Sequence, residues 1–147
     1  ESRVHKIKRA ADCVMGLFPF EAPVFAKYQL NYRFVGHPMA DAIALSPDKA
    51  LARQTFNLDD KQPVVALLPG SRSSEVQQLL PIFLDSFEQM QSVQGNIRAL
   101  VPAVNTVRET QIQTILTRYP KAVSDAVIVT RQVAREVMIA SDAVLLS

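Results

Sequence analysis

Apolar runs and amphipathic segments alternate regularly along the second two-thirds of the chain. Four runs of apolar residues predict strands, at residues 64–68, 97–101, 126–130 and 143–146. Between them, apolar residues at helical spacing predict helices at residues 74–90, 107–119 and 133–140. Nearly continuous apolar strands separated by amphipathic helices are typical of β-α-β units around a parallel sheet covered on both faces. The predicted fold class is therefore α/β.

The first part of the chain carries a less regular pattern. It predicts a basic helix, a buried strand, a second helix and a second strand, at residues 2–11, 12–18, 21–28 and 32–35. Pro19 ends the first strand, and Cys13 within it is expected to pack as a small buried hydrophobe. Two short strands are too few for a stable sheet of their own. This part is therefore expected to be the tail of a preceding domain.

Turn and cap residues add further boundaries. The stretch Ser46-Pro47-Asp48 predicts a helix capped by Ser46 that runs to about Phe56. Asn105 is expected to cap the helix that follows the second strand of the regular part. Pro81 is expected to interrupt the long helix and to begin a second helical segment. Three residues after it are expected to face the sheet: Phe83, Leu84 and Phe87.

Composition narrows the function classes. The 147 residues are 48% hydrophobic and 20% charged, which fits an ordinary globular domain, and a net charge of +2 is too small to favour nucleic acid. The single cysteine favours a reducing cytosol. No run reaches the roughly 20 apolar residues of a spanning helix, and no signal peptide or metal-ligand spacing is found. Basic residues gather near the N-terminus, on either a solvated helix face or a surface for anionic lipid: Arg3, His5, Lys6, Lys8 and Arg9.

Candidate chemistry lies in the sequence VVALLPGSRSSEV, residues 64–76. A loop that joins a parallel strand to a helix N-terminus suits phosphate, because orphan backbone N–H groups and the helix dipole meet there. Gly70 and Ser71 would contact the ligand, Arg72 would grip phosphate oxygens, and Glu75 would brace Arg72 or accept from a sugar hydroxyl. The alternative is an ordinary helix cap at Ser73 or Ser74. Neither GxxxxGK[ST] nor GxGxxG is present, which disfavours nucleoside triphosphatases and dinucleotide dehydrogenases.

Several separated motifs together resemble one family. In order along the chain, these motifs are FPFE, FVGHPMAD, LLPGSRSSEV, LLPIFLDSF and ASDAVLLS. They are similar to segments that occur in the same order in the lipid-A-disaccharide synthases, bacterial hexosyltransferases of the GT-B type. The resemblance implies two Rossmann-like domains that face a cleft. Residues 1–43 would be the end of the first, acceptor-side domain and the hinge. Residues 44–147 would be most of the second, UDP-donor-binding domain, up to its switch point.

The resemblance also implies a reaction without a cofactor. The family transfers 2,3-diacylglucosamine from its UDP donor to 2,3-diacylglucosamine 1-phosphate with inversion, and UDP leaves. Arg72 would stabilise the leaving diphosphate, with Gly70 and Ser71 as loop contacts. His37 in the hinge would approach the donor or bond across the hinge, Asp41 would cap a turn, and Ser147 would begin a further substrate loop.

The same resemblance predicts where the enzyme is located and how it assembles. It predicts peripheral attachment to the cytoplasmic face of the inner membrane of a Gram-negative bacterium, and a possible homodimer. The general base and the acid that holds the ribose are expected outside these residues, so the chain alone is expected to be inactive. It starts without methionine and stops on a strand, which also suggests a fragment.

Two alternatives stay open at this point. One is another enzyme of the GT-B type that uses a UDP-sugar, either a peptidoglycan-lipid glycosyltransferase or a UDP-sugar epimerase. The other is a non-catalytic module that attaches to a membrane surface through the basic helix. A substrate panel separates the first alternative, and salt-dependent binding to lipid vesicles tests the second.

Overall fold

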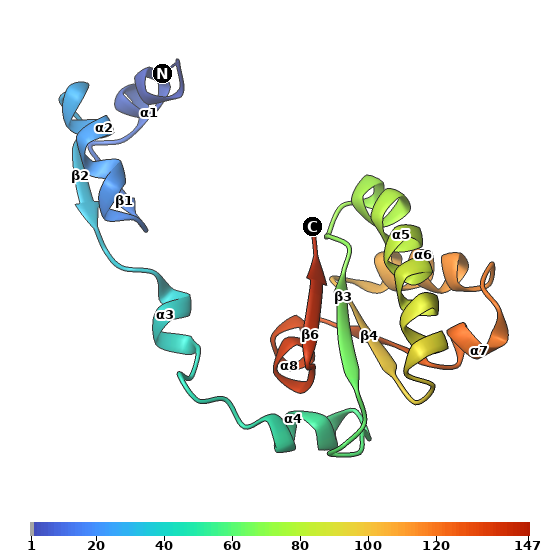
Figure 1. The fold of residues 1–147 in the computed structure, drawn as a ribbon. Coiled ribbons are helices and arrows are strands. Elements are labelled where there is room, and N and C mark those ends of the chain that lie inside the picture. Colours follow the sequence, from blue (N-terminus) through green and yellow to red (C-terminus); the bar gives the residue numbers. More distant parts are fainter. Residues whose placement is uncertain (1) are drawn as a thin grey trace. The chain divides into compact units, whose positions relative to one another are not determined.

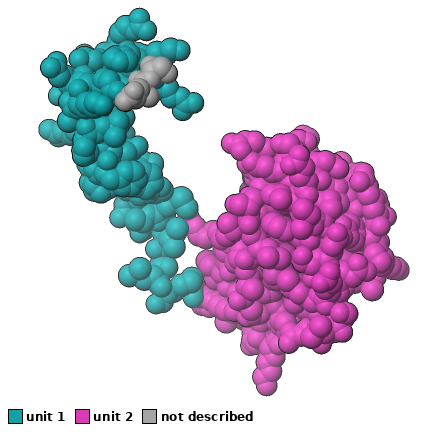
Figure 2. Space-filling view, turned by 45° about the horizontal axis from the view of Figure 1, so that its top comes forward, with its two compact units in different colours: residues 1–47 teal, residues 48–147 magenta. Residues whose placement is uncertain are grey.

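The computed structural model describes residues 2–147. The chain divides into two compact units, with the boundary between Pro47 and Asp48. Figure 2 colours the two units separately. The second unit holds the regular part of the sequence. Its elements are α4 (Lys49–Thr55), β3 (Val64–Leu68), α5 (Ser73–Val93), β4 (Arg98–Ala103), α6 (Thr106–Leu116), α7 (Lys121–Ser124), β5 (Val127–Arg131), α8 (Ala134–Ala140) and β6 (Ala143–Leu146).

The strands of the second unit form one parallel sheet in the order β5-β4-β3-β6 (Figure 1). Helices α5, α6 and α7 lie on one face and α4 and α8 on the other. Side chains of β3 alternate between the faces: Val65 and Leu67 pack with α5 and α6, whereas Val64 and Ala66 pack with α4 and α8. Both sides of β3 are therefore buried, which explains its continuous apolar sequence and confirms the α/β prediction.

Two helix starts test the cap predictions. Asn105 caps α6, as predicted, because its side-chain oxygen accepts from the Arg108 N–H at 2.9 Å. The Ser46 cap is wrong: α4 begins at Lys49, and Asp48 Oδ1 accepts from the Leu51 N–H at 2.9 Å. The Asp48 carboxylate lies three residues before its donor, which is the spacing that a cap requires, whereas Ser46 lies too far upstream.

Helix α5 runs without a break through Pro81, so the predicted second helical segment is wrong. Proline removes one backbone hydrogen bond, but the apolar stripe continues across it. The stripe consists of fully buried side chains: Val76, Leu80, Leu84 and Phe87. Its burial against the sheet holds the helix together. As predicted, Leu84 and Phe87 face the core, and Phe83 packs against it partly buried.

The first unit is built on a smaller sheet. Its elements are α1 (Ser2–Ala10), β1 (Cys13–Gly16), a 3₁₀ turn η1 (Pro19–Glu21), α2 (Ala22–Lys27), β2 (Asn31–Phe34) and α3 (Pro38–Ala42). Strands β1 and β2 pair in parallel. The predicted strand forms, at Cys13–Gly16, but its predicted burial is wrong, because Cys13 is exposed and Met15 is 74% exposed. Two strands offer too little surface to cover each other's side chains.

Candidate functional site

The carboxyl edge of the larger sheet brings together segments that are distant in sequence. From β3 the chain adds β4 and β5 on one side and returns to place β6 on the other, so the strand order reverses between β3 and β6. Leu68 pairs with Leu146 there, and the Ser147 N–H donates to the Leu68 carbonyl at 3.3 Å. Open α/β sheets bind ligands at such a switch point.

A cavity of about 350 Å³ lies at this edge. Gly70 and Ser71 line it from the loop after β3, and Ser147 lines it from the end of β6. Pro102 at the end of β4 and Ala134 at the start of α8 supply apolar walls. The fold thus brings together three of the predicted site residues around one space. The volume falls within the range of small-ligand sites, about 300–1,000 Å³.

The loop itself, residues 69–72 and here called the GSR loop, is organised by Glu75. Glu75 Oε2 accepts from the backbone N–H groups of Ser71, at 3.0 Å, and Arg72, at 2.9 Å. Its other oxygen, Oε1, lies 2.5 Å from Arg72 Nη1. Arg72 is the N-cap residue, so neither Ser73 nor Ser74 caps the helix. The carboxylate of the first turn reaches back to the cap residue, as in half of a capping box.

The charges of the GSR loop are unevenly exposed. The Arg72 side chain is 80% exposed and the Glu75 side chain 27%. The Arg72 backbone N–H lowers the pKa of Glu75; the Ser71 N–H and the guanidinium act in the same direction and outweigh partial burial. Glu75 therefore stays ionised at neutral pH, and Arg72 keeps further guanidinium N–H donors for an anion.

Helix α5 is also anchored from α6. The Gln111 side chain donates to the Ser73 carbonyl at 3.0 Å, and its oxygen lies 3.4 Å from the Ser73 hydroxyl and accepts from Arg108. These contacts fix the first turn after the GSR loop. Sequence reasoning missed Gln111, because nothing in the spacing of α6 separates it from other exposed polar residues.

The FVGHPMAD motif, with the predicted residues His37 and Asp41, lies in the first unit. His37 is the N-cap of α3, where its Nδ1 accepts from the Met39 N–H at 3.2 Å, and its ring lies 5.8 Å from that of Phe18. Asp41 lies in the first turn of α3 and is not its cap. The hydrogen bond of His37 in this structure is thus a local helix cap.

Known proteins resemble the whole chain. The profile of the family described as Lipid-A-disaccharide synthetase matches residues 1–147. The chain belongs to this family. A lipid-A-disaccharide synthase of Alteromonas mediterranea is 47% identical over 148 residues, which cover 100% of this chain and 39% of the relative. One of Haemophilus ducreyi is 41% identical over 147 residues, covering 100% and 37%. The chain thus spans about two fifths of the length of these relatives.

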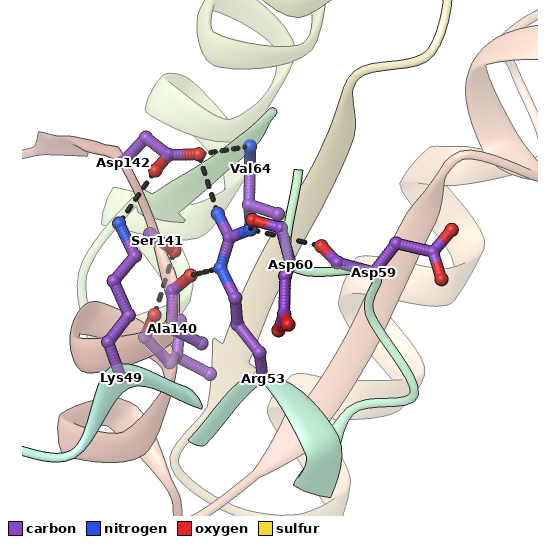
Figure 3. Close-up of polar contacts among 9 residues, drawn as sticks. Lys49, Arg53, Asp59, Asp60, Val64, Ala140, Ser141 and Asp142 are labelled. Atoms are coloured by element: carbon purple, nitrogen blue, oxygen red, sulfur yellow. Dashed lines mark hydrogen bonds and ion pairs between the residues drawn. The ribbon is translucent and has the colours of Figure 1, made fainter. Parts of the chain in front are cut away.

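The ASDAVLLS motif, one of those that resemble the synthetase family, has a different place from the GSR loop. Figure 3 shows Asp142 of this motif joined to Arg53, to Lys49 and to the backbone N–H of Val64. Arg53 is 4% exposed and also donates to the Ala140 carbonyl at 3.1 Å. This cluster lies where β3 and β6 begin, the edge opposite the cavity. Its charged groups satisfy one another, which indicates a structural role.

Two kinds of feature are absent from the part of the chain that the structure describes. Residues 2–147 hold no group of three or more potential metal ligands. Within the same range, no helix is both long and apolar enough to cross a membrane.

Proposed function

We propose that this chain is the donor-binding part of a glycosyltransferase that makes the lipid A disaccharide. In this reaction 2,3-diacylglucosamine passes from UDP to 2,3-diacylglucosamine 1-phosphate with inversion, and UDP leaves. The observation that carries the proposal is the exposed guanidinium of Arg72 on a strand-loop-helix turn beside a cavity at the switch point. The names of the family and of its curated members support it.

The proposed chemistry assigns the GSR loop to the leaving group. As the bond between the sugar's anomeric carbon and the diphosphate oxygen breaks, negative charge grows on the diphosphate. The Arg72 guanidinium, with N–H donors in a planar fork, stabilises that charge more in the transition state than in the bound substrate. Gly70 leaves the room that the Glu75 side chain fills over the loop, and Ser71 and Ser147 offer hydroxyls from the two sides of the cavity.

The larger assembly belongs to the same proposal. Residues 1–43 supply the end of the acceptor-side domain with the hinge residue His37, and residues 44–147 supply most of the donor domain. The general base and the ribose-binding acid lie outside the chain, so we expect no transferase activity from the 147 residues alone. Peripheral attachment to the cytoplasmic membrane face and a homodimer complete the proposal.

The membrane part of this proposal draws on α1. Val4 is buried, whereas the basic side chains around it are exposed: Arg3, His5, Lys6, Lys8 and Arg9. Lys8 also donates to the Tyr28 carbonyl at 2.8 Å, which ties α1 to α2. A basic helix face of this kind is attracted to anionic lipid, and salt weakens the attraction.

Titration with UDP tests the binding role. Backbone amide signals of residues 68–76 in the 147-residue chain are followed with UDP up to millimolar concentration. We expect saturable shifts for the unchanged chain. Arg72→Ala should bind UDP at least about tenfold more weakly, because charge-assisted hydrogen bonds are worth about 1.5–3 kcal/mol. Arg118→Ala, which removes an exposed arginine that follows α6, is the matched control and should bind as the unchanged chain does. Equal affinity of all three proteins would refute the role of Arg72.

Transfer itself is tested in a chimaera. These 147 residues replace the matching segment of the Alteromonas mediterranea relative, to which they are 47% identical. Activity with UDP-2,3-diacylglucosamine, but not with UDP-N-acetylglucosamine, supports the lipid A reaction. Activity with UDP-N-acetylglucosamine, but not with UDP-2,3-diacylglucosamine, would favour the alternative of a peptidoglycan-lipid glycosyltransferase or a UDP-sugar epimerase.

A further inference from the structure

We propose that Glu75 is a positioning residue that acts through Arg72: it holds the guanidinium ready for a diphosphate and does not itself contact the ligand. This inference rests on the proposed function, in which Arg72 binds UDP. The inference is based on the different groups that the two carboxylate oxygens of Glu75 bind. Oε2 holds the loop backbone at Ser71 and Arg72, and Oε1 holds the Arg72 guanidinium.

The exposure of Arg72 makes such a partner necessary. An arginine side chain that is 80% exposed samples many rotamers unless a neighbour fixes it. Fixing a side chain of this kind at the moment of binding costs about 0.5–1.5 kcal/mol. The contact between Arg72 Nη1 and Glu75 Oε1, at 2.5 Å, places the guanidinium before the ligand arrives. Its remaining N–H groups stay free of Glu75 and can face phosphate oxygens.

Gly70 shows that the loop is shaped around Glu75. The φ angle of Gly70 is +109°, a conformation that side chains disfavour. A Cβ built at this position would lie 2.7 Å from the Cβ of Glu75 and closer still to Oε2. The absence of a side chain at residue 70 therefore lets the Glu75 carboxylate lie over the loop and reach its N–H groups.

The charge of Glu75 is otherwise unfavourable at such a site. A carboxylate beside a diphosphate repels it, and this direct effect alone would weaken binding. Three N–H donors already take three of the roughly four acceptor positions of its carboxylate, which leaves little capacity for a sugar hydroxyl. In the proposal, the ordering of Arg72 outweighs this repulsion.

The replacement Glu75→Gln separates the two tasks. Glutamine at this position of a capping box can still accept from the backbone. Glutamine has one acceptor oxygen and no charge; when that oxygen keeps the backbone contacts, the NH₂ group faces Arg72 and the ion pair is lost. The cap therefore remains while the hold on Arg72 is removed.

A double-mutant cycle then measures the effect. UDP affinity is measured for the unchanged chain, Arg72→Ala, Glu75→Gln and the double variant, by calorimetry and by the amide shifts of residues 68–76. Removing the Glu75 charge changes direct repulsion of UDP equally in both backgrounds, so this term cancels. We expect Glu75→Gln to weaken binding about three- to tenfold more when Arg72 is present than when it is absent.

The Arg72 side-chain signal provides a second readout. In the chain without UDP, Glu75→Gln should shift the Arg72 Nε–Hε resonance and leave the Ser71 amide near its original position. Equal effects of Glu75→Gln in both backgrounds, or an unchanged Nε–Hε resonance, would overturn the positioning role while leaving Arg72 as a UDP ligand. If Arg72→Ala binds UDP as tightly as the unchanged chain, the proposed function and this inference both fail.

Discussion

Arg53→Met should destabilise the second unit strongly, although Arg53 lies far from the cavity. The Arg53 guanidinium donates to four acceptors from two segments of the chain, residues 59–60 and residues 140–142. They are the carbonyls of Asp59 at 3.0 Å, Asp60 at 2.6 Å and Ala140 at 3.1 Å, and Asp142 Oδ2 at 2.8 Å. Methionine fills much of the same volume but donates to none of them.

The expected loss of stability depends on which hydrogen-bond partners each acceptor retains after Arg53 is replaced. Ala140 ends α8 and is fully buried, so its carbonyl loses its donor at a cost of about 1–3 kcal/mol. Asp142 loses a charge-assisted bond but keeps Lys49 at 2.6 Å, and its side chain is 48% exposed, so this loss is partly screened. Water can replace the donor at the exposed residues Asp59 and Asp60. Together these terms give a loss of about 2–4 kcal/mol.

Urea unfolding measures this loss, followed by circular dichroism and by the amide signal of Leu100 in the sheet. With a slope of about 2 kcal/mol per molar urea, the middle of the usual range, the midpoint should fall by about 1–2 M. The control is Arg131→Met, whose ion pair with Glu109 spans 3.6 Å between side chains 50% and 32% exposed. It should change stability by no more than about 1 kcal/mol. A midpoint for Arg53→Met equal to that of the control would refute the reasoning.

Three further predictions follow. Burial tends to raise the pKa of Asp142, but its hydrogen bonds and the Arg53 charge lower it overall, so its stabilising effect should be present above about pH 3.9 and vanish as pH falls through the lowered value. In Asp142→Asn the urea midpoint should decrease less as the pH falls than it does in the unchanged chain. An equal decrease in the two proteins would count against this. Gly70→Ala should destabilise by about 1–3 kcal/mol and displace Glu75, seen as a moved Ser71 amide signal. Flotation with anionic vesicles should weaken with added salt and with removal of residues 1–10; persistence through both would exclude this helix as the contact.

The regular part of the fold could be predicted because its signals are local. Strand β3 is apolar on both faces, and the same pattern in β4 and β5 marks a covered parallel sheet. The start of a helix is harder to predict where two nearby residues can both serve as its N-cap. Ser46 and Asp48 can both cap a helix, and only the position of the Leu51 N–H decides between them.

The errors share a physical cause, which is dependence on tertiary contacts. The apolar run around Cys13 resembles a core strand, but its burial depends on neighbours that two short strands do not supply. Pro81 resembles a helix break, yet burial of Leu80 and Leu84 on either side keeps α5 continuous. Sequence pattern reports what a segment prefers, and packing decides between preferences of similar strength.

The site was predictable in part. The position of Gly70, Ser71 and Arg72 after a buried strand suggested an anion-binding loop, and the sheet order places Ser147 beside it. The dual hold of Glu75 on backbone and guanidinium required coordinates, because spacing alone permits either contact. The Arg53 cluster was missed, since its partners are 87 and 89 residues away in sequence.

The two polar clusters lie at opposite ends of β3, and this separation can be tested. Asp142 holds the N–H of Val64 at the amino end, whereas Ser147 bonds to Leu68 at the carboxyl end. Four residue steps of about 3.3 Å place these ends about 13 Å apart, beyond direct contact. Arg53→Met should therefore lower the urea midpoint and leave UDP affinity unchanged at a urea-free, fully folded baseline. Arg72→Ala should lower UDP affinity and leave the urea midpoint unchanged, because the Arg72 side chain is mostly exposed. A loss of UDP affinity in folded Arg53→Met would instead show that strain at the base of the sheet reaches the GSR loop through β3.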